Sequence, residues 1–98
     1  MKRFRLSPLA RQDIREIWAY IANDSIEAAT KVRQRIRDDC LQLAQHPFLG
    51  HRREDLTTRD DVLFWPVYSY LVIYRPAKTL LEILRVLHGN RDVRNVLG

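Results

Sequence analysis

Residues 64–92 read FWPVYSYLVIYRPAKTLLEILRVLHGNRD, and this stretch is the most informative about the fold. Tyr70 to Arg75 is dense in the β-branched and aromatic residues that favour strands, and Leu80 to Leu87 is a second apolar run. The PAKT segment between them is typical of a turn. Val62 to Trp65 predicts a further short strand that breaks at Pro66. Three strands with short connections predict an antiparallel meander.

Upstream of the meander, the chain begins with a strand signal followed by a helix signal. Lys2 to Leu6 alternates polar and apolar residues, which is typical of a short strand. Ser7 is suited to cap a helix and Pro8 to occupy its first position, because the first backbone N–H groups of a helix have no partner within it. We expect the helix to run to about Ala22. Its inner stripe at helical spacing consists of Ala10, Ile14, Ile17, Trp18 and Ile21.

The opposite side of this first helix is mixed. Gln12, Asp13 and Glu16 fall on it and predict an outward polar face. Leu9 and Tyr20 fall on the same side, although both are large and partly apolar. Singly exposed apolar residues are normal on protein surfaces, so position alone assigns these two no role.

A second amphipathic helix follows, capped by Ser25 and ended at His46-Pro47. The polar segment from Pro47 to Asp61 predicts a loop. The order is therefore β-α-α-β-β-β, an α+β fold in which an N-terminal helical hairpin packs on one face of a mostly antiparallel sheet. Residues 1–98 are enough for one domain and too few for two. The pattern does not predict which strand the first one joins.

Charge and cysteine content limit the partners and the cellular compartment that we expect for this protein. The net charge of +5 favours polyanions or acidic proteins as partners without choosing among them. The single cysteine, Cys40, permits no intrachain disulfide, and no signal peptide or membrane span is predicted, so we expect a cytoplasmic protein. His46 and His51 lack the pattern of a zinc site, and phosphate-binding glycine motifs are missing, so neither a metal nor a cofactor is expected.

Four segments resemble the ParE branch of the RelE/ParE toxin family: LSPLARQDIREIWAYIA, LAQHPFLGHRRE, VYSYLVIYR and EILRVLHGNRD. Together they cover most of the chain, in the order and spacing of that family. The resemblance implies a type II toxin held inactive by a cognate ParD-like antitoxin from the same operon. Because such antitoxins lay a helix or an extended arm along the toxin, Leu9 and Tyr20 become candidates for antitoxin binding.

The resemblance also frames the choice of target. RelE-like members cut mRNA in the ribosomal A site, whereas ParE-like members poison DNA gyrase without a catalytic centre of their own. The nuclease members carry an arginine at the place that holds Tyr70 or Leu71 here, and neither residue is cationic. The resemblance therefore implies a gyrase inhibitor that blocks replication, with no catalytic residue, no membrane contact, and nucleic acid met only through its complexes. Two alternatives stay open: an mRNA endonuclease using His88 as acid or base, and a non-toxic basic binding module.

The residues predicted to contact the target are Arg85, His88, Arg91 and Arg94. Each also has a structural interpretation. A buried unpaired charge is very costly, so pairing of Arg85 with Glu82, Asp92 or a helix carboxylate is the favoured interpretation. For His88, the favoured interpretation is a strand-end histidine bonded to a neighbouring loop. The two C-terminal arginines could equally belong to a solvated basic surface.

Overall fold

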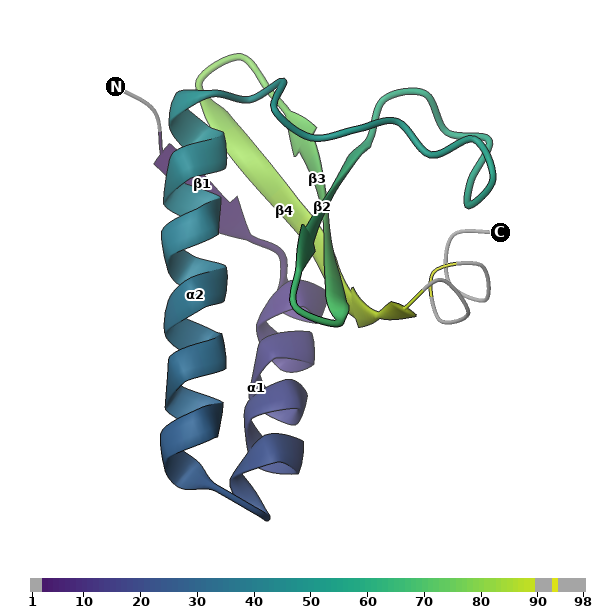
Figure 1. Cartoon of the computed structure of the whole chain (residues 1–98). Coiled ribbons are helices and arrows are strands. Elements are labelled where there is room, and N and C mark those ends of the chain that lie inside the picture. Colours follow the sequence, from purple (N-terminus) through teal and green to yellow (C-terminus); the bar gives the residue numbers. More distant parts are fainter. Residues whose placement is uncertain (1–2, 90–92, 94–98) are drawn as a thin grey trace.

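The computed structural model describes residues 3–89 and residue 93 of the chain. Its elements are β1 (Arg3–Leu6), α1 (Pro8–Ala22), α2 (Ile26–Gln45), β2 (Leu63–Val67), β3 (Tyr70–Pro76) and β4 (Leu80–His88) (Figure 1). This order confirms the predicted β-α-α-β-β-β arrangement. The helical turn that the tail could hold falls almost entirely outside the described residues. Within the described part, no helix is long and apolar enough to cross a membrane.

The four strands form one sheet in the order β1-β4-β3-β2. The meander β2-β3-β4 is antiparallel, as predicted. The first strand, whose neighbour the sequence left open, lies parallel to β4, with Arg3 opposite Leu80 and Leu6 opposite Ile83. Strands β1 and β2 are thus the two edges of the sheet.

The prediction that the second strand breaks at Pro66 is wrong, because β2 continues through it to Val67. Phe64 exchanges two backbone hydrogen bonds with His51, of 2.9 and 2.8 Å, so its polar groups point away from β3. Pro66 lies two residues further along the same strand and points the same way. On that edge a missing N–H removes no bond of the β2–β3 ladder, which is why the strand tolerates proline.

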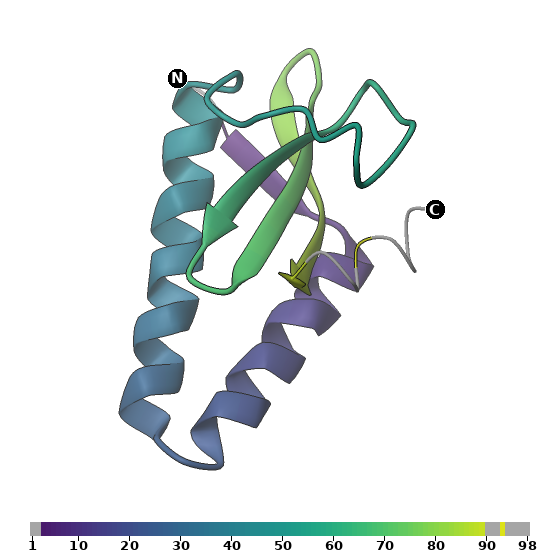
Figure 2. The same ribbon diagram turned by 45° about the vertical axis from the view of Figure 1, so that its right-hand side comes forward.

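The helical hairpin covers one face of the sheet, and its far end extends beyond the strands (Figures 1 and 2). Both N-caps are confirmed: the side-chain oxygens of Ser7 and Ser25 accept bonds from Ala10 N (2.9 Å) and Ala28 N (3.0 Å). The larger core lies between helices and sheet and is built from Ala10, Ile36, Cys40, Leu43, Ala44, Val67, Val72, Tyr74, Leu81, Ile83 and Val86.

A second, smaller core lies on the other face of the sheet. The long loop before β2 contributes Leu56 and Val62 to it, and the sheet contributes Phe64, Leu71 and Ile73, among others. Successive residues of β3 therefore enter alternate cores. Burial on both faces explains why β3 reads as a continuous apolar run instead of an alternating one.

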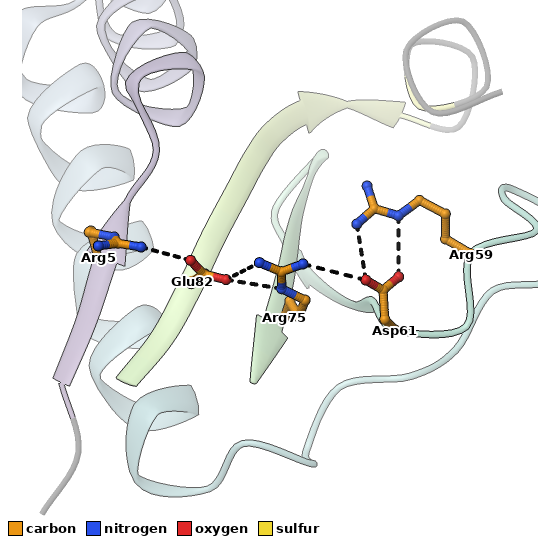
Figure 3. Close-up of polar contacts among 5 residues, drawn as sticks. All are labelled: Arg5, Arg59, Asp61, Arg75 and Glu82. Carbon is orange, nitrogen blue, oxygen red and sulfur yellow. Dashed lines mark hydrogen bonds and ion pairs between the residues drawn. The ribbon is translucent and has the colours of Figure 1, made fainter. Parts of the chain in front are cut away.

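Beside this smaller core, the outer face of the sheet carries a row of ion pairs (Figure 3). Glu82 on β4 bonds Arg5 on β1 (2.7 Å) and Arg75 on β3 (Nε to Oε1, 2.9 Å). Arg75 also reaches Asp61 at 3.6 Å, and Asp61 accepts two bonds of 3.2 Å from Arg59. The row joins three strands to the loop before β2 and commits Glu82 to partners other than Arg85.

Candidate functional site

A pocket of about 430 Å³ opens between α1 and the C-terminal end of β4, and we call it the α1–β4 pocket. It brings together Tyr20, predicted to bind the antitoxin, and His88, predicted to contact the target. The predicted antitoxin-binding residue and the predicted target-binding residue therefore share one surface. Its lining consists of Asp13, Glu16, Ile17, Tyr20, Tyr70, Val86, Leu87 and His88.

The pocket exists because β1 is shorter than β4. Pairing between these strands ends at Ile83, and Leu84 then forms a bulge that has no partner in the β3–β4 register. Beyond that point side chains of α1 and of its N-cap, Ser7, bond the backbone groups of β4 that a longer β1 would pair with. Ser7 Oγ donates to the carbonyl oxygen of Leu84 (2.7 Å), and Asp13 Oδ2 accepts from the backbone N–H of Val86 (3.0 Å). Helix α1 thereby forms one wall of the pocket.

The prediction that Asp13 lies on an outward polar face is wrong. Asp13 is buried and accepts two bonds from Arg85, from Nε at 2.8 Å and from Nη2 at 2.9 Å. Leu9, Asp13, Glu16 and Tyr20 share one stripe of the helix, spaced four, three and four residues apart. This stripe faces the end of β4, where a carboxylate finds both a guanidinium and a free backbone N–H.

The favoured interpretation of Arg85, pairing with a carboxylate, is confirmed, and of the three partners considered it is the helix carboxylate, Asp13. Its side chain is 19% exposed and that of Asp13 is 9% exposed, so the pair is largely shielded from water. The hydrogen bond to Asp13 raises the pKa of Arg85, with a further contribution from the charge of that carboxylate. Arg85 therefore lies behind the pocket in a fixed position, with its charge balanced.

Two aromatic rings form the opposite wall. Tyr70 and His88 are directly paired across β3 and β4, and their rings meet edge to face with centroids 5.3 Å apart. Burial raises the pKa of Tyr70, and the nearby Tyr20 adds to the shift. Within the described residues the contact of the imidazole is with Tyr70 rather than a hydrogen bond to a loop. Gly89, at φ +69°, then ends the strand in a conformation that favours glycine.

The chemistry of the pocket is acidic and aromatic, in a chain of net charge +5. Among the described residues its lining includes two phenols and two carboxylates, of which Asp13 is paired with Arg85, and holds no lysine or arginine. These described side chains suit a cationic or aromatic side chain of another protein. In the described part of the chain, no three His, Cys, Asp or Glu side chains gather as metal ligands would.

The other predicted site residues fall elsewhere. Leu9 is 52% exposed on the same stripe as Tyr20, about three helical turns away, and is not part of the pocket lining. Arg91 and Arg94 lie outside the described residues. Sequence reasoning missed Asp13 as a component of the pocket. The signal was available, because Leu9 and Tyr20 flank it on the one stripe that was neither fully polar nor fully apolar.

Comparison with known proteins agrees with the fold and the sequence motifs. The family described as "ParE toxin of type II toxin-antitoxin system, parDE" matches residues 4–93. "Toxin ParE1" of Caulobacter vibrioides is 32% identical over the full length of both chains. "Putative toxin Y4kP" of Sinorhizobium fredii is 34% identical over 98% of this chain and 97% of its own length.

Two further matches bear on branch and fold. "Toxin RelE3" of Caulobacter vibrioides is 31% identical over 91% of this chain and 96% of its own length. A solved structure titled "Chromosomal ParDE TA system from P. aeruginosa" superposes with a TM-score of 0.74. It covers 91% of this chain and 97% of that chain at 21% identity, and so supports the fold alone. With the family match extending over nearly the whole sequence, this chain belongs to the ParE toxin family of type II toxin–antitoxin systems.

Proposed function

We propose that this toxin acts in the cytoplasm by binding DNA gyrase, and that a ParD-like antitoxin neutralises it by covering the α1–β4 pocket. The observation that carries the proposal is the chemistry of the described part of that pocket, which presents carboxylates and aromatic rings, whereas a nuclease needs cations. An acidic and aromatic pocket is suited to grip a protein. The toxic effect would then come from holding gyrase in a DNA-cleaved state, with no bond made or broken by the toxin.

The positions around the pocket argue against cleavage of RNA. Attack by a 2′-OH requires a base, an acid and cationic stabilisation of the phosphate. The guanidinium of Arg85 is bonded to the pocket residue Asp13 at 2.8 and 2.9 Å. Where nuclease members carry an arginine, Leu71 is buried and Tyr70 packs against His88. The imidazole of His88 is exposed and meets Tyr70, and Arg85 is committed to Asp13, which supports His88 as a contact residue better than as a catalytic acid.

The exposed stripe of α1 supports the antitoxin part of the proposal. Tyr20 is 75% exposed at the mouth of the pocket, and Leu9 is 52% exposed on the same stripe. Tyrosine is one of the residue types enriched among the few that dominate binding energies in protein interfaces. An antitoxin segment lying along this stripe would cover Tyr20 and shield His88 from the target. Neutralisation would then be direct competition for one pocket.

The proposal is tested by measuring binding of purified toxin to gyrase holoenzyme with biolayer interferometry. We expect His88→Ala to weaken binding by about tenfold, as for a central contact. Thr30→Ala, an exposed change on α2 away from the pocket, is the matched control and should leave affinity unchanged. Saturating antitoxin should abolish gyrase binding. Failure of the wild-type toxin to bind gyrase would contradict the choice of target. A ternary complex of gyrase, toxin and antitoxin would contradict the competition.

A further inference from the structure

A second exposed apolar surface lies at the other end of the β3–β4 hairpin from the α1–β4 pocket. Phe48, which follows α2, is 80% exposed and is the most exposed large hydrophobic side chain in the described part of the chain. A groove of about 200 Å³ adjoins it. The groove is lined by Ala44, Pro47, Phe48, Pro76, Ala77, Lys78, Leu80 and Leu81. The end of α2 and the β3–β4 turn lie side by side here (Figures 1 and 2). We call this the Phe48 surface.

The loop that carries Phe48 is fixed from below. The hydroxyl of Tyr74, a buried residue of the larger core, donates to the carbonyl oxygen of Pro47 (2.7 Å) and accepts from the backbone N–H of Gly50 (2.9 Å). A Cβ at Gly50 would lie 2.5 Å from that hydroxyl and 2.9 Å from the carbonyl oxygen of Phe64, so only glycine fits. Phe48 is thus held outward on a rigid loop, and a rigid anchor loses little entropy on binding.

The surroundings of the Phe48 surface are basic. Lys78 is the one charged residue among the described residues of its lining, and residues 44–53 and 76–81 contain no Asp or Glu. Arg3, which is exposed, lies opposite Leu80 across the β1–β4 pairing. The nearest carboxylate on β4, Glu82, is already bonded to two arginines. The complementary ligand is therefore a protein segment with an apolar anchor flanked by carboxylates.

We propose that the Phe48 surface is a second docking site for the antitoxin, and that it receives an apolar side chain next to acidic residues of that protein. This rests on the proposed pairing of the toxin with a ParD-like antitoxin. Phe48 and the apolar groove beside it form one continuous patch with a basic rim, which marks a protein interaction site, and a partner bound throughout the resting state keeps that patch covered. A target that binds only transiently leaves the surface exposed for most of the time, which favours the antitoxin as the occupant.

The two docking sites are well placed for one antitoxin chain. The Pro76–Leu81 pair marks the Phe48 end of the hairpin, and the Tyr70–His88 pair marks the pocket end. Leu81 and His88 are seven residue steps apart along β4, which corresponds to about 23 Å of extended strand. A connecting arm of at least about seven residues reaches that far, and engaging both sites raises affinity beyond either alone.

The experiment measures the affinity of the full-length toxin for the full-length antitoxin encoded beside it, by isothermal titration calorimetry. We expect Phe48→Ser to weaken binding by at least about tenfold. Lys78→Glu should weaken it by severalfold and reduce its dependence on salt. Ile26→Ser is the matched control, because Ile26 is 65% exposed at the start of α2 and lines neither the α1–β4 pocket nor the Phe48 surface, so its replacement should leave affinity unchanged. Thermal unfolding of each variant confirms that the fold is intact.

Wild-type affinity in both Phe48→Ser and Lys78→Glu would overturn the proposal. Loss of toxicity in Phe48→Ser with unchanged antitoxin affinity would also overturn it, because the surface would then face the target. The readout does not involve gyrase. If gyrase proves not to be the target and Phe48→Ser still weakens the antitoxin complex, the proposed target fails and this inference stands.

Discussion

Replacing Asp13 by asparagine tests whether a buried ion pair fixes α1 to the end of β4. The carboxylate accepts two bonds from Arg85 and one from the backbone N–H of Val86. Asparagine keeps the size of the side chain and can still accept the Val86 bond. It removes the charge that balances Arg85, whose side chain is only 19% exposed.

The magnitude follows from what is left behind. Breaking a fully buried pair by removing one partner costs about 3–5 kcal/mol. Because Arg85 retains some access to water and the introduced amide can keep one guanidinium contact, we expect a loss of about 2 kcal/mol in the free energy of unfolding. Against a total of about 5–15 kcal/mol for a typical domain, that is a large fraction.

Urea unfolding followed by tryptophan fluorescence measures the change, since Trp18 and Trp65 lie on α1 and β2. Glu16→Gln is the matched control: it neutralises an exposed carboxylate on the same stripe and should change stability by less than about 0.5 kcal/mol. In a double-mutant cycle with Arg85→Gln, the coupling should be about 1–3 kcal/mol. A coupling near zero would show that this ion pair does not fix the helix to the strand, provided that the dependence of the unfolding free energy on urea concentration is the same in all variants.

Three further predictions concern other parts of the fold. Gly50→Ala should lower the free energy of unfolding by about 1–3 kcal/mol, because its Cβ would meet Tyr74 Oη at 2.5 Å; equal urea midpoints for variant and wild type would contradict this. Bonds from Arg75, and then from the arginine on β1, hold the pKa of Glu82 below its ordinary 4.5. The stabilisation from this carboxylate is therefore present above its unfolded pKa and lost as pH falls through the lower folded pKa. Acid should destabilise wild type more than Glu82→Gln, and thermal melts at pH values above and below 4.5 compare the two. Burial raises the pKa of the Cys40 thiol to about 12, so a thiol-reactive reagent at pH 8 should modify it only as fast as the protein unfolds; rapid modification of the native protein would show that this part of the core is open.

The sequence predicted the order of elements because each element carries its own local signal. The run from Tyr70 to Arg75, the caps at Ser7 and Ser25 and the break at His46-Pro47 depend on neighbouring residues, and all agree with the structure. The parallel docking of β1 depends on contacts distant in the sequence, and periodicity carries no information about it. Pro66 was misjudged because its tolerance requires knowing that β2 is an edge strand.

Polar residues in the interior were the harder part of the candidate site. Asp13 and Asp39 are both buried and bonded to partners far along the chain, and Asp13 had been assigned to the outward face of its helix. Asp39 accepts from the indole N–H of Trp65 (3.1 Å), and Asp13 accepts from Arg85. Helical spacing assigns a carboxylate to the surface unless its distant partner is known. The pairing of Arg85 was foreseen from the cost of an unpaired charge, but the identity of its partner was not.

The proposed target is tested most directly by a gyrase supercoiling assay with purified toxin, ATP and relaxed plasmid, followed by protease treatment to release cleaved DNA. We expect loss of supercoiling and the appearance of linear DNA, both reversed when antitoxin is added. We also expect mRNA on toxin-treated ribosomes to stay intact. Normal supercoiling at saturating toxin, together with cleaved mRNA, would remove gyrase as the target and assign the toxin to the ribosome.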